Sequence, residues 1–335
     1  MKIQCQKADL LNGVNIVLKA IPVKSTMPIL GCIVIEAGNQ YIKLIANDME
    51  LGIETLVKGT VSEPGTVALD AKIFSEIIRR LPENEVFITT DDKYMTEIVC
   101  EKANFSISGK SSEEFPYLPK IEKENAVVLS QFTLKEVIRQ TVFSISDNEN
   151  NKIMTGELFE IKGNELRVIS LDGHRISIRR IEMKDAYEEQ KVIIPGKTLN
   201  EISKILSGEV SSTVQIYFTD KHALFEFDDT VVLTRLIEGE YYHIDQMLSS
   251  DYETKVTINK KELQSCIERA SLLIRETDKQ PVIIDIDNNN FELKINTAIG
   301  SMNEEIGIEK GMEKGIEKVA KEMLCKGAEI SFVIG

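Results

Sequence analysis

The sequence predicts an α+β fold made of three tandem repeats, each an antiparallel sheet with two helices packed on one face. Three observations predict it: turn-like tripeptides at a fixed spacing, strand-like runs on both sides of them, and helix-like segments at matching positions. The turns are centred on Asn39, Asn164 and Asn289, so consecutive turns are 125 residues apart. Self-similarity at a fixed period indicates repeated structural units.

Each of the three turns separates two strand-like runs. Gly38-Asn39-Gln40 lies between ILGCIVIEA and YIKLIA, and Gly163-Asn164-Glu165 lies between GELFEI and ELRVIS. Asn288-Asn289-Asn290 lies between PVIIDID and FELKIN. Alternating and β-branched residues are typical of strands, and Gly-Asn or Asn-Asn suits a tight turn. The sequence therefore predicts a hairpin at each of these three places.

The start of each repeat predicts a short strand followed by a helix. Apolar residues recur at helical spacing in the segments that follow the strands, and a carboxylate near each helix start suits the positive end of the helix dipole. The predicted strands are residues 2–6, 127–132 and 255–259, the helices are residues 8–20, 133–143 and 260–273, and the carboxylates are Asp9, Glu136 and Glu262.

A second helix is predicted in the first two repeats, at residues 71–81 and 197–206. Their last residues, Leu81 and Leu206, are again 125 apart. Linkers are expected near residues 114–125 and 246–254. The predicted domains are residues 1–122, 123–248 and 249–335.

Composition narrows the class of protein. The chain of 335 residues has a net charge of −14, which argues against a protein that binds nucleic acid by neutralising phosphates. No membrane span or secretory signal is visible, so a cytoplasmic location is expected. The five cysteines are widely spaced and odd in number, which predicts reduced thiols and no zinc site. They are Cys5, Cys32, Cys100, Cys266 and Cys325.

Two motifs and the N-terminal MKI strand carry a resemblance to a known family. The motifs are STMPILGCIVIEA at residues 25–37 and SLDGHRISIRR at residues 170–180. Together with the repeats, they resemble the bacterial sliding clamps, the β subunits of DNA polymerase III, from Met1 to about Ile306. The resemblance implies a non-catalytic accessory subunit without cofactor or metal. It implies a head-to-tail homodimer that encircles duplex DNA, with helices inside and sheets outside.

A ring would reconcile the acidic chain with DNA, because it holds the duplex topologically. The five predicted helical segments contain 11 Lys or Arg and 6 Asp or Glu, a net of +5, so the remainder carries −19. The plainer explanation is that helices tolerate Lys and Arg well. Under the resemblance, the candidate DNA-facing residues are Lys24, Arg79, Arg80, Lys135, Arg139, Lys197 and Lys204.

The Asp-Gly-His-Arg cluster at residues 172–175 invites a catalytic interpretation. A catalytic site needs a nucleophile, a base and an orienting acid, and neither His222 nor His243 lies in a companion motif. Asp-Gly between alternating strands is equally typical of a tight hairpin turn.

The family instead uses this segment as one wall of a pocket for short linear motifs of polymerases, the clamp loader and repair proteins. The sequence departs from the family at Tyr242, where proline is usual, and at Gln246, where arginine is common. The resemblance implies these pocket residues: Met154, Leu171, Gly173, His174, Arg175, Ile176, Tyr242, Gln246 and Met247.

Ring closure in the family joins the first domain of one chain to the third domain of the other. The alternative for Phe105, Leu272 and Leu273 is that they are ordinary core residues. The matching interface residues here are Lys102, Phe105, Ile107, Arg269, Leu272, Leu273, Glu304 and Glu305.

The sequence after Ile306 departs from the repeat pattern. It contains GIEK-GMEK-GIEK, a biased four-residue repeat, from about residue 307. We therefore expect a third repeat that is incomplete, and two further hypotheses stay open. One is a clamp-derived protein-binding module that does not form a loaded ring. The other is an enzyme whose tail resembles that of a nuclease-like protein.

Overall fold

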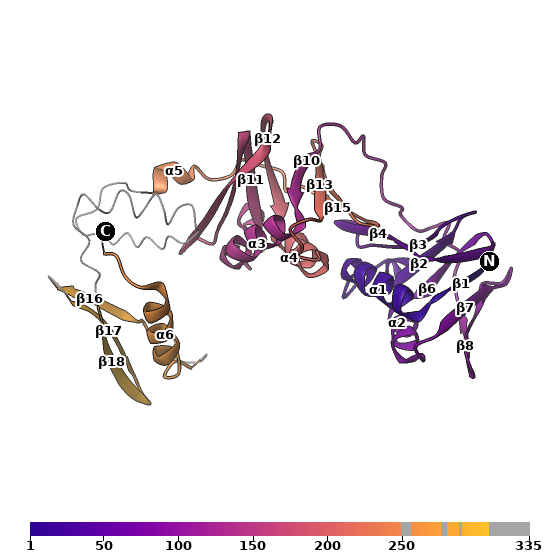
Figure 1. Ribbon diagram of the computed structural model, residues 1–335, viewed down its shortest axis with the longest axis horizontal. Helices are drawn as coiled ribbons and strands as arrows, with labels where there is room; N and C mark the ends of the chain where they lie inside the picture. Colours follow the sequence, from indigo (N-terminus) through magenta and orange to yellow (C-terminus); the bar gives the residue numbers. More distant parts are fainter. Residues whose placement is uncertain (249–255, 276–279, 288–289, 308–335) are drawn as a thin grey trace. The chain divides into compact units, whose positions relative to one another are not determined.

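The computed structural model describes residues 1–248, 256–275, 280–287 and 290–307 (Figure 1). The chain divides into two compact units, Met1–Tyr241 and Tyr242–Gly335. The first unit holds the first two predicted repeats and the second unit holds the described part of the third.

The first repeat follows the predicted order of strand, helix, strands, helix and strands. The helix over residues 71–80 is capped at its N-terminus by Asp70, whose carboxylate accepts a hydrogen bond from the Ile73 amide at 2.9 Å. This is the N-cap geometry that satisfies a free helical N–H group. The elements are β1 (Lys2–Gln6), α1 (Lys7–Val17), η1 (Leu18–Ala20), η2 (Pro28–Gly31), β2 (Cys32–Ala37), β3 (Ile42–Asn47), β4 (Leu51–Val57), β5 (Gly59–Glu63), β6 (Gly65–Asp70), α2 (Ala71–Arg80), β7 (Glu85–Thr90), β8 (Met95–Cys100) and β9 (Ala103–Ser108).

The second repeat has the same order of helices. Its first helix is capped by Ser130, whose hydroxyl accepts from the Thr133 amide at 3.0 Å. The elements are β10 (Val127–Ser130), α3 (Gln131–Thr141), η3 (Val142–Ser144), η4 (Lys152–Thr155), β11 (Gly156–Leu171), β12 (Ile176–Pro195), α4 (Gly196–Ile205), β13 (Thr213–Phe218), β14 (His222–Phe227) and β15 (Thr230–Arg235).

One eight-stranded sheet spans both repeats, in the order β10-β13-β14-β15-β4-β3-β2-β6. The seam between the repeats is the antiparallel pair β15–β4, where Thr230 faces Thr55 and Thr234 faces Leu51. The hydroxyls of Thr55 and Thr230 are 2.8 Å apart in a buried hydrogen bond. A five-stranded sheet, β5-β1-β7-β8-β9, and the pair β11–β12 complete the unit.

The two faces of the eight-stranded sheet are covered differently. The four helices bury their apolar sides in one large core that includes Phe74, Phe159 and Phe225, and α1 packs on α2 as α3 packs on α4. The opposite face is covered by the linker between the repeats. There Phe115 packs on residues of β2, β3 and β6, and Leu118 contacts residues on both sides of the seam.

The predicted hairpin at Gly163-Asn164-Glu165 is not a separate turn. Instead, β11 runs through these residues, and its register against β12 shifts twice around Gly163, which has a φ of +59°. A positive φ of this kind suits glycine, because it has no Cβ. The tight turn of this pair lies at Asp172–Arg175, where the Asp-Gly dipeptide had indicated one.

The second unit contains α5 (Ile244–Met247), α6 (Lys260–Ser271), β16 (Ile283–Asp287), β17 (Asn290–Thr297) and β18 (Gly300–Gly307). The three strands form one antiparallel sheet, and α6 buries Leu263, Cys266 and Ala270 against it. The expected strand at residues 255–259 is wrong for its described part, where residues 256–259 hold only an isolated bridge. The turn residues 288–289 and the tail 308–335 lie outside the described residues.

Four of the five cysteines lie in the described residues, and all four are buried free thiols. Burial raises the pKa of the Cys5 thiol to about 12, so this thiol stays protonated at neutral pH. Cys325 lies outside the described residues. Among the described helices, none is long and apolar enough to cross a membrane.

Candidate functional site

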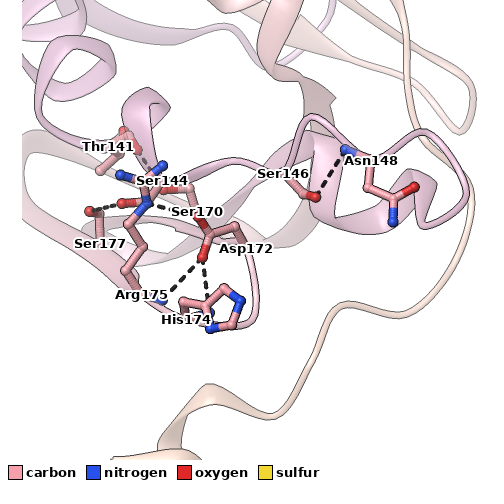
Figure 2. A network of polar contacts seen from close by, with 9 residues as sticks. All are labelled: Thr141, Ser144, Ser146, Asn148, Ser170, Asp172, His174, Arg175 and Ser177. Carbon is pink, nitrogen blue, oxygen red and sulfur yellow. Dashed lines mark hydrogen bonds and ion pairs between the residues drawn. The ribbon is translucent and has the colours of Figure 1, made fainter. Parts of the chain in front are cut away.

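The turn at Asp172–Arg175 is held by one carboxylate (Figure 2). Asp172 Oδ1 accepts hydrogen bonds from the backbone amides of His174 at 2.9 Å and Arg175 at 3.1 Å. Its other oxygen, Oδ2, accepts from Arg175 Nε at 2.8 Å. These bonds favour the ionised form, so the pKa of Asp172 is lowered. Gly173 takes a φ of +89°, which closes the turn without a Cβ clash.

Hydroxyl groups tie both strands that flank this turn to the end of α3. Ser170, just before the turn, donates to the Thr141 carbonyl at 2.5 Å. Ser177, just after it, shares a hydrogen bond with Ser144 of η3, with 2.6 Å between the two hydroxyl oxygens. Ser170, Thr141 and Ser144 are fully buried. The two strands beside the turn are therefore held to α3 and η3 by a largely buried hydrogen-bond network (Figure 2).

A buried carboxyl group belongs to the same region. Thr141 also donates its hydroxyl proton to Glu157 Oε2 at 2.7 Å, and Glu157 is fully buried. Burial raises the pKa of Glu157 to about 8, so the carboxyl is mostly protonated at neutral pH. Within the described residues, its Oε1 atom has no hydrogen-bond partner.

The structure brings five of the nine predicted pocket residues together on the turn. Leu171 is buried, Ile176 is half-buried, and Gly173, His174 and Arg175 are exposed. The His174 ring makes no hydrogen bond within the part of the chain that the structure describes. It therefore has neither a nucleophile nor an orienting acid in contact there.

The other four predicted pocket residues lie elsewhere. Met154 belongs to η4 of the first unit, and its carbonyl accepts a hydrogen bond from the Ser146 amide at 2.8 Å. Tyr242, Gln246 and Met247 belong to the second unit, where α5 ends at Met247. Gln246 and Met247 are exposed, and Tyr242 is half-buried.

The predicted DNA-facing cations of the helices are mostly paired with carboxylates or carbonyls of their own chain. Arg79 and Arg80 both pair with Glu76, and Arg139 pairs with Glu136 one turn away. Exposed pairs of this kind contribute little stability, so the cations stay available to other anions. In the same way, Lys204 pairs with Glu201, Lys197 with Asp48, and Lys135 donates to the Leu206 carbonyl, while Lys24 is exposed between η1 and η2.

A cleft of about 600 Å³ lies where the two repeats meet. Residues of α1, β4, α4 and the β14–β15 turn line it. Its charged residues are balanced between lysines and aspartates. Sequence reasoning had missed Lys19 and Lys58, because neither lies in a motif. The charged lining residues are Lys19, Lys58, Lys204, Asp9, Asp228 and Asp229.

The predicted interface residues of the first unit lie at a sheet edge. β9 is the last strand of the five-stranded sheet, and it carries Phe105, which is 39% exposed, and half-buried Ile107. Lys102 lies in the turn between β8 and β9. Phe105 is therefore not an ordinary core residue of this chain.

The predicted interface residues of the second unit cluster at the end of α6. Leu272 is 79% exposed, whereas Leu273 packs on the small core, so the core alternative holds only for Leu273. Arg269 Nε donates to Glu304 Oε2 at 2.9 Å, and this bond lowers the pKa of the Glu304 carboxyl. Glu305 lies beside them in an open pocket.

Comparisons with known proteins agree with this fold. Two family models match: the N-terminal domain of the DNA polymerase III beta subunit at residues 1–119, and its central domain at residues 128–243. The beta sliding clamps of Staphylococcus epidermidis and Staphylococcus aureus are 33% identical to the chain over 315 residues. Each alignment covers 91% of this chain and 83% of the relative.

Solved structures give the same result. A putative DNA polymerase III beta subunit from Eubacterium rectale is 62% identical, with a TM-score of 0.90, covering 93% of this chain and 85% of that one. The sliding clamp of Bacillus subtilis is 33% identical, with a TM-score of 0.88, covering 92% of this chain and 84% of that one. The chain therefore belongs to the bacterial beta sliding clamps, the non-catalytic processivity subunits of DNA polymerase III.

Proposed function

We propose that two copies of this chain close head to tail into a ring around duplex DNA in the cytoplasm. The observation that carries the proposal is the eight-stranded sheet shared by the two repeats, together with the single core that contains residues of all four helices of the first unit. A continuous sheet makes the two repeats one stiff segment, so the helix surfaces form a single wall that can face the duplex.

The helix cations suit loose and sequence-independent contact with phosphates. Arg139 and Lys204 are each paired with a glutamate three residues away on the same helix. A phosphate that displaces such a glutamate gains little net energy, because one exposed ion pair replaces another. This exchange favours sliding over tight binding.

Ring closure would use the edge strand β9 of one copy and the end of α6 with β18 of the other. An edge strand presents unpaired backbone groups, which favours pairing with another strand. Leu272 is a large apolar side chain exposed at the end of α6, and a second copy would bury it. Two identical contacts related by twofold symmetry close a ring.

Partner proteins would bind through short apolar motifs at the Asp172–Arg175 turn. Leu171 and Ile176 supply apolar surface there. The polymerase, the clamp loader and repair proteins are the expected partners.

Retention on DNA tests the ring. The chain is loaded onto nicked circular DNA with clamp loader and ATP, and the circle is then linearised. A closed ring stays on the circle and leaves the linear molecule. Equal retention on both forms would mean ordinary DNA affinity, and no retention would leave a protein-binding module that does not form a loaded ring.

A pair of variants ties the result to the interface. Leu272→Glu places a charge at an exposed position, so the chain should fold and yet lose retention on the circle. Val210→Glu is the matched control, because Val210 is also exposed and lies outside every proposed site. Loss of retention in both variants would argue against the α6 interface.

A further inference from the structure

The Arg175 side chain is exposed but held on two sides. Its Nε atom donates to Asp172 Oδ2 at 2.8 Å, and its guanidinium carbon lies 5.8 Å from the centre of the Phe143 ring. Phe143 belongs to η3, whose next residue, Ser144, is bonded to Ser177 beyond the turn. The turn and the ring therefore share one hydrogen-bonded support, which restricts the orientation of the guanidinium plane.

The two terminal nitrogens of this guanidinium, Nη1 and Nη2, have no hydrogen-bond acceptor among the described residues. Within the described residues, Asp172 is the only hydrogen-bond acceptor of the Arg175 side chain, and it takes the Nε proton. The Nη1 and Nη2 protons thus stay available, and they form the fork that matches a carboxylate in a bidentate pair. Arg139 makes an instructive contrast, because Glu136 occupies both its Nε and its Nη2.

Phe143 itself is 57% exposed, an unusual position for a large aromatic ring. One part of the ring lies under Arg175, and the exposed part adds apolar surface beside the turn. The pair thus offers an apolar surface and a directed cation within a few residues of each other.

We propose that Asp172 and Phe143 position Arg175 as a carboxylate receptor, so that partner segments bind there with an acidic group beside apolar residues. This inference rests on the proposed peptide-binding function of the turn. Phe143 is a positioning residue, since it acts through Arg175. Asp172 already offsets the charge of Arg175, so recognition depends on directed hydrogen bonds more than on long-range attraction.

The test is a comparison of matched peptides on the full chain. Fluorescein-labelled hexapeptides of Leu, Phe and Gly carry one Glu at each position in turn, or Gln at the same position, with an amidated C-terminus. A further peptide without Glu has a free C-terminal carboxylate. These arms separate a side-chain carboxylate from a terminal one. Fluorescence anisotropy gives the ratio of the two dissociation constants for each matched pair.

For at least one position, the acidic peptide should bind about tenfold more tightly than its neutral partner, as expected for a charge-assisted bidentate pair. Arg175→Lys should reduce this ratio to about twofold, since lysine has no planar fork. Phe143→Ala should reduce it to about threefold, and Phe143→Tyr should restore it, because tyrosine keeps the stacking face. Arg235→Lys is the matched control, an exposed ion-paired arginine on β15, and should keep the full ratio.

The outcomes separate the inference from the function on which it rests. Peptides that bind equally well with Glu, Gln or a free C-terminus would overturn the carboxylate receptor and leave the pocket intact. If Phe143→Ala weakens the binding of both peptides of a pair equally, the ratio of their dissociation constants stays unchanged. Phe143 would then contact the peptide directly and would not position Arg175. If no peptide binds the unaltered chain, the peptide pocket fails and the receptor fails with it.

Discussion

The two units of the chain differ in how their helices are supported. In the first unit, four helices share one core, and an eight-stranded sheet crosses the boundary between the repeats. In the second unit, the described residues give α6 a three-stranded sheet and a small core around Phe291 and Leu293. In the first unit, the pairing of β4 with β15 therefore joins the cores of the two repeats into one. The two repeats that share a sheet should therefore unfold as one cooperative unit, and not as two separate repeats.

Truncating one fully buried apolar side chain in each core should show this difference most strongly. Phe225→Ala removes a fully buried ring, and roughly 3–5 kcal/mol of stability should be lost by the whole first unit. Leu293→Ala should cost roughly 2–5 kcal/mol in the second unit alone. Urea unfolding, followed by hydrogen exchange of each unit, measures both losses. Exchange that rises in both units for either variant would mean that the chain unfolds as one.

The buried carboxyl of Glu157 should make the stability of the first unit depend on pH. Its pKa is raised from 4.5 to about 8 in the folded chain, so the folded state holds an extra proton between these values. Stability is then greatest below about pH 4.5, as far as this group is concerned, and falls as pH rises through about 8. This loss of stability between pH 5 and pH 8 should be about 3–4 kcal/mol.

Denaturant midpoints across this pH range measure that slope. Glu157→Gln keeps a group that can accept from Thr141 and cannot ionise, so this variant should have the flatter profile. An equal slope in both chains would assign the pH dependence to other groups. The second unit, which does not contain Glu157, should show no corresponding change.

The seam should respond to loss of its buried hydroxyl pair. Thr55→Val leaves the Thr230 hydroxyl without its partner on the seam, and about 1–3 kcal/mol should be lost. Changing both residues to valine should recover most of this, because no unsatisfied hydroxyl remains. Thermal unfolding of the two single variants and the double variant gives the coupling. Additive losses would show that the hydroxyl pair does not stabilise the seam.

The smallest expected effect compares the same chemistry in both units. Ser130 caps α3 and Asn259 caps α6, each through a side-chain oxygen that accepts from the first turn. Replacement by alanine should cost about 1 kcal/mol in either helix. For Ser130→Ala, hydrogen exchange should rise across the whole first unit, because that unit is expected to unfold as one. For Asn259→Ala, hydrogen exchange should rise only locally, in α6. Local opening of α3 alone would weaken the comparison.

Local patterns predicted the helices because each of α1, α2, α3, α4 and α6 has its own apolar periodicity. The seam could not be predicted in this way, since β4 and β15 lie far apart in sequence and their pairing leaves no local signal. The expected turn at Gly163 was wrong for a related reason. Gly-Asn is compatible with a turn and with an irregular strand, and only the pairing with β12 decides between them.

The site was predicted in part. Asp172-Gly173 indicated the turn, because that dipeptide favours tight hairpins. Phe143 was missed as a functional candidate, since it lies at the end of a predicted helix, where an aromatic residue suggests core. Its place beside Arg175 accompanies the hydrogen bond between the hydroxyls of Ser144 and Ser177, which no spacing in the sequence connects.

The linker that covers the outer face of the sheet makes the covalent connection between the repeats mechanically redundant. Asn47 of β3 donates a hydrogen bond to the Pro116 carbonyl at 2.7 Å, and Lys123 pairs with Glu226 of β14 at 2.7 Å, so the linker is fastened on both sides of the seam. The repeats are joined a second time by β4 and β15. A single cut in the linker should leave two fragments that remain associated, and the two halves expressed separately should assemble without a peptide bond between them.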